Sequence, residues 1–215
     1  MTKKVAVILS GCGVRDGSEI HEATCSLLAI RFLNANYQCF SINKEQYQVI
    51  NHLTNQKTSE KRNVLAESAR IARGNIKSLD EFNATEYGLL VFPGGSGAAM
   101  NLCSYAYEGK NYTVDKAVSK AILNMIELQK PICAFCIAPV IIAKVLKDSE
   151  LTVGGQNAVS SDIEKAGAKH VETKKGEYHV DEKNKIISSA CYMNNITIDE
   201  LYQEISKGIK KGLEM

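Results

Sequence analysis

Cys136 is the residue whose surroundings most favour chemistry. It lies at the centre of Ala134–Ala138 (AFCIA), between an apolar strand-like run and a helix-like segment that opens with Pro139. Small residues two positions on either side of a nucleophile let strand and helix meet in a sharp turn, as in the G-x-S-x-G elbow of hydrolases. A thiol there lies at a helix N-terminus, whose dipole favours the thiolate. Cys136 is therefore predicted to be a nucleophile; the alternative is a buried cysteine that ends a core strand.

The other cysteines give weaker signals. Cys133 and Cys136 form C-x-x-C, the spacing of thioredoxin-type pairs. Cys133 falls inside the expected strand, so the two side chains are expected on opposite faces, and the redox pair is the less favoured interpretation. Seven cysteines without a secretory signal indicate reduced thiols and a cytoplasmic protein. No clustered Cys/His spacing predicts a metal site.

Two glycine-rich segments follow other expected strands. In Pro93–Gly97 (PGGSG), the N–H groups of Gly94 and Gly95 could join that of Ile137 in an oxyanion hole. Ser10–Gly17 (SGCGVRDG) resembles a dinucleotide fingerprint, but its third glycine comes one residue late for G-x-G-x-x-G. No cofactor is therefore expected.

An acidic cluster opens the first expected helix with Glu19, His21 and Glu22. A carboxyl group near a cysteine can hold or receive its proton. Helical spacing puts Glu22 off the apolar stripe, which fits a solvated face, although at a sheet edge that face can look into a pocket. Glu19, His21, His179 and Cys12 are possible accessory groups.

Apolar runs of strand length alternate with helix-length periodic segments. This pattern predicts an α/β fold with a mostly parallel sheet and helices on both faces. The expected strands are Val5–Leu9, Tyr37–Ile42, Tyr87–Phe92, Ile132–Phe135 and a hairpin of Tyr178–Val180 with Lys185–Ser188. The expected helices are Ser18–Leu33, Glu60–Arg73, Val114–Leu128, Ala138–Leu146 and Ile198–Leu213, while 43–61 and 96–113 are expected to be irregular.

Charge and length exclude several classes of function. The 215 residues carry 26 basic and 24 acidic side chains, for a net charge of +2. This balance gives no electrostatic basis for binding nucleic acid or a membrane surface. No apolar run approaches the roughly 20 residues that a membrane-spanning helix needs.

Several stretches together resemble the ElbB-type branch of the ThiJ/PfpI superfamily, which has the class I glutamine amidotransferase-like fold. They are VILSGCGVRDGSEIHE (7–22), VINHLT (49–54), RNVLAESARIARG (62–74), PGGSGAAMNL (93–102) and CIAP (136–139). The resemblance implies a flavodoxin-like three-layer sandwich formed by one domain over residues 1–215, often as a homodimer. It also implies a nucleophilic Cys136 with Glu22 as its partner carboxyl.

Some superfamily members are glyoxalases that convert glyoxal or methylglyoxal to hydroxy acids without glutathione or metal. Many members have a histidine directly after the nucleophile, whereas this chain has Ile137. The leading expectation is a weak, cofactor-free glyoxalase-like enzyme acting on a small reactive aldehyde through a Cys136 hemithioacetal. The alternatives are a redox-sensing or regulatory protein that oxidises Cys136 reversibly, and a thiol oxidoreductase that uses Cys133 and Cys136.

Overall fold

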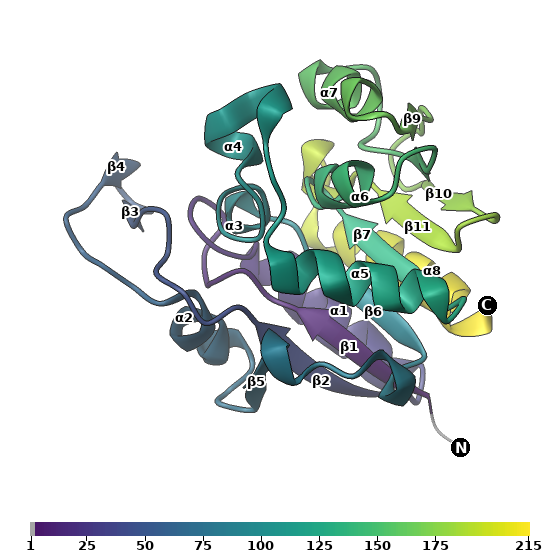
Figure 1. Ribbon diagram of the computed structural model, residues 1–215, viewed down its shortest axis with the longest axis horizontal. Helices are drawn as coiled ribbons and strands as arrows, with labels where there is room; N and C mark the ends of the chain where they lie inside the picture. The colour runs from purple at the N-terminus through teal and green to yellow at the C-terminus, as the bar shows by residue number, and fades with distance from the viewer. Residues whose placement is uncertain (1–2) are drawn as a thin grey trace.

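The computed structural model describes residues 3–215 and is built around a seven-stranded sheet (Figure 1). The strand order is β10-β11-β7-β6-β1-β2-β5. These strands are β1 (Lys4–Ile8), β2 (Asn36–Ser41), β5 (Ile76–Ser78), β6 (Leu89–Phe92), β7 (Ile132–Phe135), β10 (Tyr178–Asp181) and β11 (Ile186–Ser189). All neighbouring strands are parallel except the hairpin of β10 and β11. The mostly parallel α/β sheet expected from the sequence is confirmed.

Helices cover both faces of the sheet (Figure 1). One face carries α5 (Lys116–Glu127) and α6 (Pro139–Val145), and the other carries α1 (Ile20–Phe32) and α8 (Ile198–Glu214). Side chains of β1 alternate between two apolar clusters, with Ala6 and Ile8 in one and Val5 and Val7 in the other. Because successive strand residues point to opposite faces, this division gives the three layers of a flavodoxin-like sandwich.

Shorter elements complete the fold. The remaining helices are α2 (Val64–Ile71), α3 (Ser96–Met100), α4 (Tyr105–Glu108) and α7 (Ala158–Ala166), with 3₁₀ turns η1 (Leu79–Glu81), η2 (Ala84–Glu86), η3 (Gly109–Asn111) and η4 (Cys191–Met193). Two small two-stranded ladders pair β3 (Ile50–Asn51) with β4 (Gln56–Lys57) and β8 (Glu150–Leu151) with β9 (Lys169–His170). Across residues 3–215, no helix has both the length and the apolar character needed to cross a membrane.

Several boundaries differ from those expected. The segment 96–113, expected to be irregular, contains α3, α4 and η3, and the structure adds α7 and β5, which lack a long apolar run. Helix α2 begins at Val64 rather than at Glu60, because the side chain of Asn63 caps it by accepting a hydrogen bond from the Ala66 N–H at 3.1 Å. These differences leave the order of the core strands unchanged.

The loops after β1 and β6 meet at the carboxyl edge of the sheet. The Ser96 N–H donates to the Val14 carbonyl at 2.8 Å, and the Gly97 N–H donates to the Gly17 carbonyl at 2.8 Å. The turn after β7 reaches the same edge, because β7 lies next to β6. Ligands of open parallel sheets bind at this edge.

Candidate active site

Cys136 occupies a strained turn between β7 and α6. Its φ of +56° lies in the left-handed region, which non-glycine residues seldom adopt. The Cys136 N–H donates to the Ser189 carbonyl at 2.9 Å, which fixes the turn to the neighbouring strand β11. Ala134 and Ala138 are fully buried on either side, where small residues let the strand and the helix approach closely. As a residue, Cys136 is only partly buried, which a nucleophile at an elbow would need.

Glu22 lies in the first turn of α1 and reaches the same turn. Its Oε2 accepts a hydrogen bond from the Gly94 N–H at 2.8 Å, its Oε1 lies 3.5 Å from the Tyr192 N–H, and its carboxyl is hydrogen-bonded to the Cys136 thiol. The side chain is fully buried. The solvated position that helical spacing allowed for Glu22 is therefore wrong, because the loop after β6 and the turn η4 cover this end of α1.

Glu19 caps helix α1 and does not contact the thiol in the way Glu22 does. Its Oε2 accepts a hydrogen bond from the Glu22 N–H at 2.7 Å, which caps α1. The Glu19 N–H in turn donates to the Gly94 carbonyl at 3.0 Å. Glu19 therefore positions Glu22 and adds negative charge next to it.

The surroundings of Glu22 and Cys136 raise the pKa of both groups. Burial, followed by the charge of Glu19, raises the pKa of Glu22 to about 8, although the Gly94 N–H opposes this shift. Burial and the Glu22 charge also raise the pKa of Cys136, against the effect of hydrogen bonds from the Gly95 and Ile137 N–H groups. The helix dipole was expected to lower the pKa of Cys136, but burial and the Glu22 charge outweigh this effect. Loss of one proton leaves a single negative charge that the carboxyl and the thiol share.

Gly94 and Gly95 shape the centre in different ways. A Cβ on Gly94 would lie 2.5 Å from the Cys136 Cβ and 2.7 Å from Glu22 Oε2, so only glycine fits between the pair. The Gly94 N–H donates to Glu22 Oε2 at 2.8 Å, whereas the oxyanion role expected for it stays a prediction. Gly95, with φ +96°, and Ile137 direct their N–H groups at the Cys136 sulfur.

The accessory candidates have partners other than the Cys136 thiol. His21 is exposed, and its Nδ1 is 2.9 Å from the hydroxyl of Tyr192. His179 is paired with Glu150 instead, at 3.1 Å between Nε2 and Oε2. Cys12 lies in the loop after β1, where burial and the charge of Glu67 raise its pKa. The structure thus brings Glu22, Gly95 and Ile137 to Cys136 but gives Cys12 and His179 other surroundings.

The turn after β11 contributes contacts that no sequence pattern indicated. Tyr192 contacts both Glu22 and His21, and Ser189 anchors the Cys136 backbone. Cys191 is fully buried, and this burial, followed by the charge of Glu22, raises the pKa of its thiol. The available signal was topological: this turn follows the strand next to β7, so it had to end at the same edge of the sheet.

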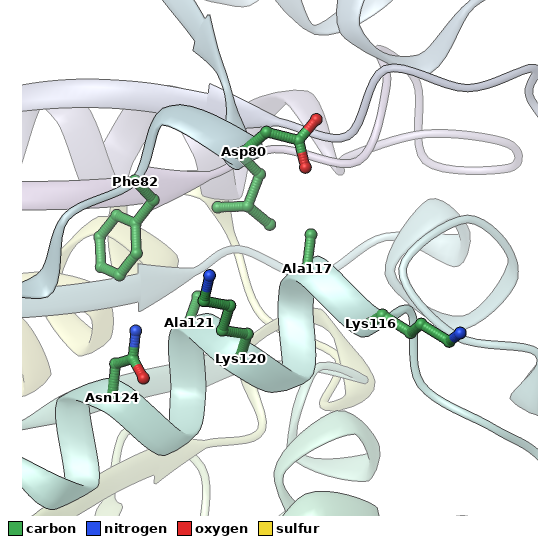
Figure 2. Close-up of a pocket in the computed structure, with 8 residues that line it drawn as sticks. Asp80, Phe82, Lys116, Ala117, Lys120, Ala121 and Asn124 are labelled. Carbon is green, nitrogen blue, oxygen red and sulfur yellow. The ribbon is translucent and has the colours of Figure 1, made fainter.

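An apolar cavity of about 280 Å³ opens beside Cys136. It is lined by Val14, Gly95, Ser96, Ala99, Met100, Tyr105, Ala106, Cys136 and Ile137. Figure 2 shows a separate pocket of about 240 Å³ between η1 and α5, lined by Asp80, Phe82, Lys116, Lys120 and Asn124 among others. The two pockets share no residue, and the second contains no thiol. Within residues 3–215, no three His, Cys, Asp or Glu side chains gather where they could hold a metal ion.

The chain is similar to named proteins over nearly its whole length. It is 39% identical to "ES1 protein homolog, mitochondrial" of Rattus norvegicus, over 99% of this chain and 84% of that protein. It is 40% identical to "Glutamine amidotransferase-like class 1 domain-containing protein 3, mitochondrial" of Homo sapiens, over 99% of this chain and 83% of that protein. No family model matches the chain.

A solved structure agrees with these relatives. An isoprenoid biosynthesis protein with an amidotransferase-like domain from Ehrlichia chaffeensis superposes with a TM-score of 0.91 at 35% identity. The match covers 98% of this chain and 99% of that one. With a cysteine elbow at the carboxyl edge of a flavodoxin-like sheet, the chain belongs to the ElbB/ES1 branch of the ThiJ/PfpI superfamily, the glutamine amidotransferase-like class 1 proteins.

Proposed function

We propose that this protein is a cofactor-free glyoxalase-like enzyme that converts small α-oxoaldehydes to hydroxy acids. One observation carries the proposal: Cys136 is a partly exposed residue that lines a cavity, and its thiol is hydrogen-bonded to a buried carboxyl whose pKa is raised to about 8. Such a carboxyl can both give and take a proton near neutral pH. This conversion moves two protons within the substrate and needs no external oxidant.

In the first step, the Cys136 sulfur adds to the aldehyde carbon. The C–S bond forms, the carbonyl electrons move to oxygen, and the thiol proton reaches that oxygen through Glu22, which gives a hemithioacetal. The N–H groups of Gly95 and Ile137 lie at the sulfur and would stabilise negative charge that develops beside it.

Glu22 would then carry the substrate proton. Its ionised carboxylate takes the proton from the former aldehyde carbon while the neighbouring carbonyl oxygen gains a proton from solvent, which gives an enediol. Glu22 exchanges its proton with solvent and delivers a proton to the neighbouring carbon, as the hydroxyl on the sulfur-bearing carbon loses its proton and becomes the thioester carbonyl. The product is an α-hydroxy thioester of Cys136. Water hydrolyses the thioester, releases the hydroxy acid and restores the thiol.

Ile137 limits the rate in this proposal. A histidine at this position could carry protons near neutral pH, and general acid–base help is worth about 10²–10⁴-fold in rate. Neither His21, bonded to Tyr192, nor His179, paired with Glu150, substitutes for it at the sulfur. The expected activity is therefore measurable but weak.

The test is lactate formation from methylglyoxal without glutathione. The wild type should turn over, whereas Cys136→Ala should be inactive and Glu22→Gln should lose at least about 10²-fold, as expected for a general acid–base group. Cys39→Ala is a matched control that removes a thiol from β2 outside the site, and it should keep wild-type activity. Equal activity of wild type and Cys136→Ala would overturn the proposal.

A second candidate is redox sensing through reversible oxidation of Cys136, favoured by the partial exposure of this thiol. A disulfide with Cys133 is disfavoured, because Cys133 is fully buried against α8, with its sulfur 3.6 Å from the Gly208 carbonyl. Mass spectrometry after mild peroxide treatment separates the candidates: a sulfenic or sulfinic adduct on Cys136 without methylglyoxal turnover favours the sensor.

The cellular compartment of the protein is the last point of the proposed function. We propose the cytoplasm, while the names of the rat and human relatives describe mitochondrial proteins. Fractionation of cells that express the native gene, followed by immunoblotting, would decide between the two compartments.

A further inference from the structure

We propose that the cavity beside Cys136 selects electrophilic carbonyl substrates with an uncharged, apolar substituent larger than methyl. The inference rests on the proposed function for the reaction, and on the cavity alone for the selectivity. The cavity reaches the nucleophile directly, because Cys136 and Ile137 form part of its wall. A substituent on the carbon next to the reacting aldehyde would therefore lie inside it.

The wall of the cavity is apolar. Val14, Met100, Tyr105 and Ile137 supply its large side chains, and no lysine, arginine, histidine, aspartate or glutamate of the described chain lines it. The hydroxyl of Tyr105 donates to Asp162 Oδ2 at 3.0 Å, so it is already bonded to a neighbouring side chain. A charged substituent would lose its hydration here without finding a partner, whereas an apolar one would gain from burial.

The wall is also held in place before any ligand arrives. The Ser96 N–H donates to the Val14 carbonyl, and the Tyr105 ring packs edge-on against Tyr112 at 5.2 Å between centroids. Tyr112 is fully buried and donates to the Val140 carbonyl at 2.6 Å. A preformed apolar cavity binds a matching group with little reorganisation.

The first experiment compares kcat/KM for tert-butylglyoxal and methylglyoxal. Each added methylene in an apolar pocket is worth up to about 10–200-fold, so a preference of at least about 10-fold for the larger substrate is expected. Ala106→Leu, which adds bulk at an exposed position of the cavity wall, should reduce this ratio several-fold. Ala158→Leu makes the same change on exposed α7 outside the cavity and should keep the wild-type ratio.

The second experiment needs no turnover. Alkylation rates of Cys136 by phenacyl bromide, iodoacetamide and iodoacetate are measured by mass spectrometry and divided by the rates with glutathione. Phenacyl bromide should be favoured over iodoacetamide by at least about 10-fold, iodoacetate should be the slowest, and Ala106→Leu should lower the preference.

The outcomes of the two experiments separate the selectivity from the reaction. Alkylation-rate ratios of Cys136 equal to those of glutathione would overturn the selectivity even if methylglyoxal is turned over. So would a kcat/KM ratio of Ala106→Leu that is indistinguishable from that of Ala158→Leu. Selective alkylation without turnover of either glyoxal would support the cavity inference and overturn the proposed function.

Discussion

Replacing Glu22 by glutamine removes a buried carboxyl whose pKa differs strongly between the folded and unfolded states. In the folded protein this pKa is about 8, and in an unfolded chain it is about 4.3. The unfolded state therefore loses the Glu22 proton first as the pH rises, which favours unfolding. Because one pKa unit corresponds to about 1.4 kcal/mol, the wild type loses about 3–4 kcal/mol of stability between pH 5 and pH 8 from this group.

Glu22→Gln should lack this pH dependence. Its amide oxygen can still accept from the Gly94 N–H, and the lost contact to Tyr192 is long at 3.5 Å, so the constant cost is about 1 kcal/mol. Urea unfolding under reducing conditions gives the free energy of unfolding at both pH values. Between pH 5 and pH 8, the free energy of unfolding of the variant relative to that of the wild type should rise by about 3–4 kcal/mol.

A control variant isolates the effect of burial. Glu127 is an exposed glutamate near the end of α5, so Glu127→Gln should differ from the wild type by the same amount at both pH values. If the difference between Glu22→Gln and the wild type is also the same at pH 5 and pH 8, the buried, protonated carboxyl described here is refuted.

Three further predictions follow from the same contacts. Gly94→Ala should lower the free energy of unfolding by about 1–3 kcal/mol in urea titrations, because its Cβ would press on Cys136 and Glu22; unchanged stability would contradict this close packing. Limited iodoacetamide should label Cys136 before the six other thiols, because Cys136 is partly exposed and has the Gly95 and Ile137 N–H groups directed at its sulfur, which favour the thiolate against the effect of burial; peptide mapping that finds another thiol first would reject its assignment as the reactive one. His179→Ala should keep wild-type activity in the lactate assay, because His179 pairs with Glu150; a large loss would place the proton carrier there.

The sequence predicts the elbow and its fold because these depend on local signals. The small residues Ala134 and Ala138 around Cys136, followed by Pro139, specify a strand that turns sharply into a helix. Alternating apolar and periodic segments specify the parallel sheet in the same way. Both expectations concern neighbours within a few residues of one another, and both match the structure.

The burial of Glu22 and the role of Gly94 could not be predicted in this way. Glu22 is covered by a turn 170 residues away in the sequence, so helical spacing alone leaves it on a polar face. The Gly94 N–H could face either a substrate oxygen or a carboxylate, and only the approach of α1 decides for the carboxylate. The direction in which the Cys136 pKa shifts likewise depends on burial and on the Glu22 charge, which raise it more than the helix N-terminus lowers it.

The most direct test of the central claim is the position of deuterium in lactate made from methylglyoxal in D₂O. If Cys136 forms the hemithioacetal and Glu22 carries the proton through an enediol, the transferred proton exchanges with solvent. The account therefore predicts lactate with deuterium at C2 by proton NMR, formed by the wild type and not by Cys136→Ala. Lactate that retains protium at C2, or that forms equally with Cys136→Ala, would contradict the account.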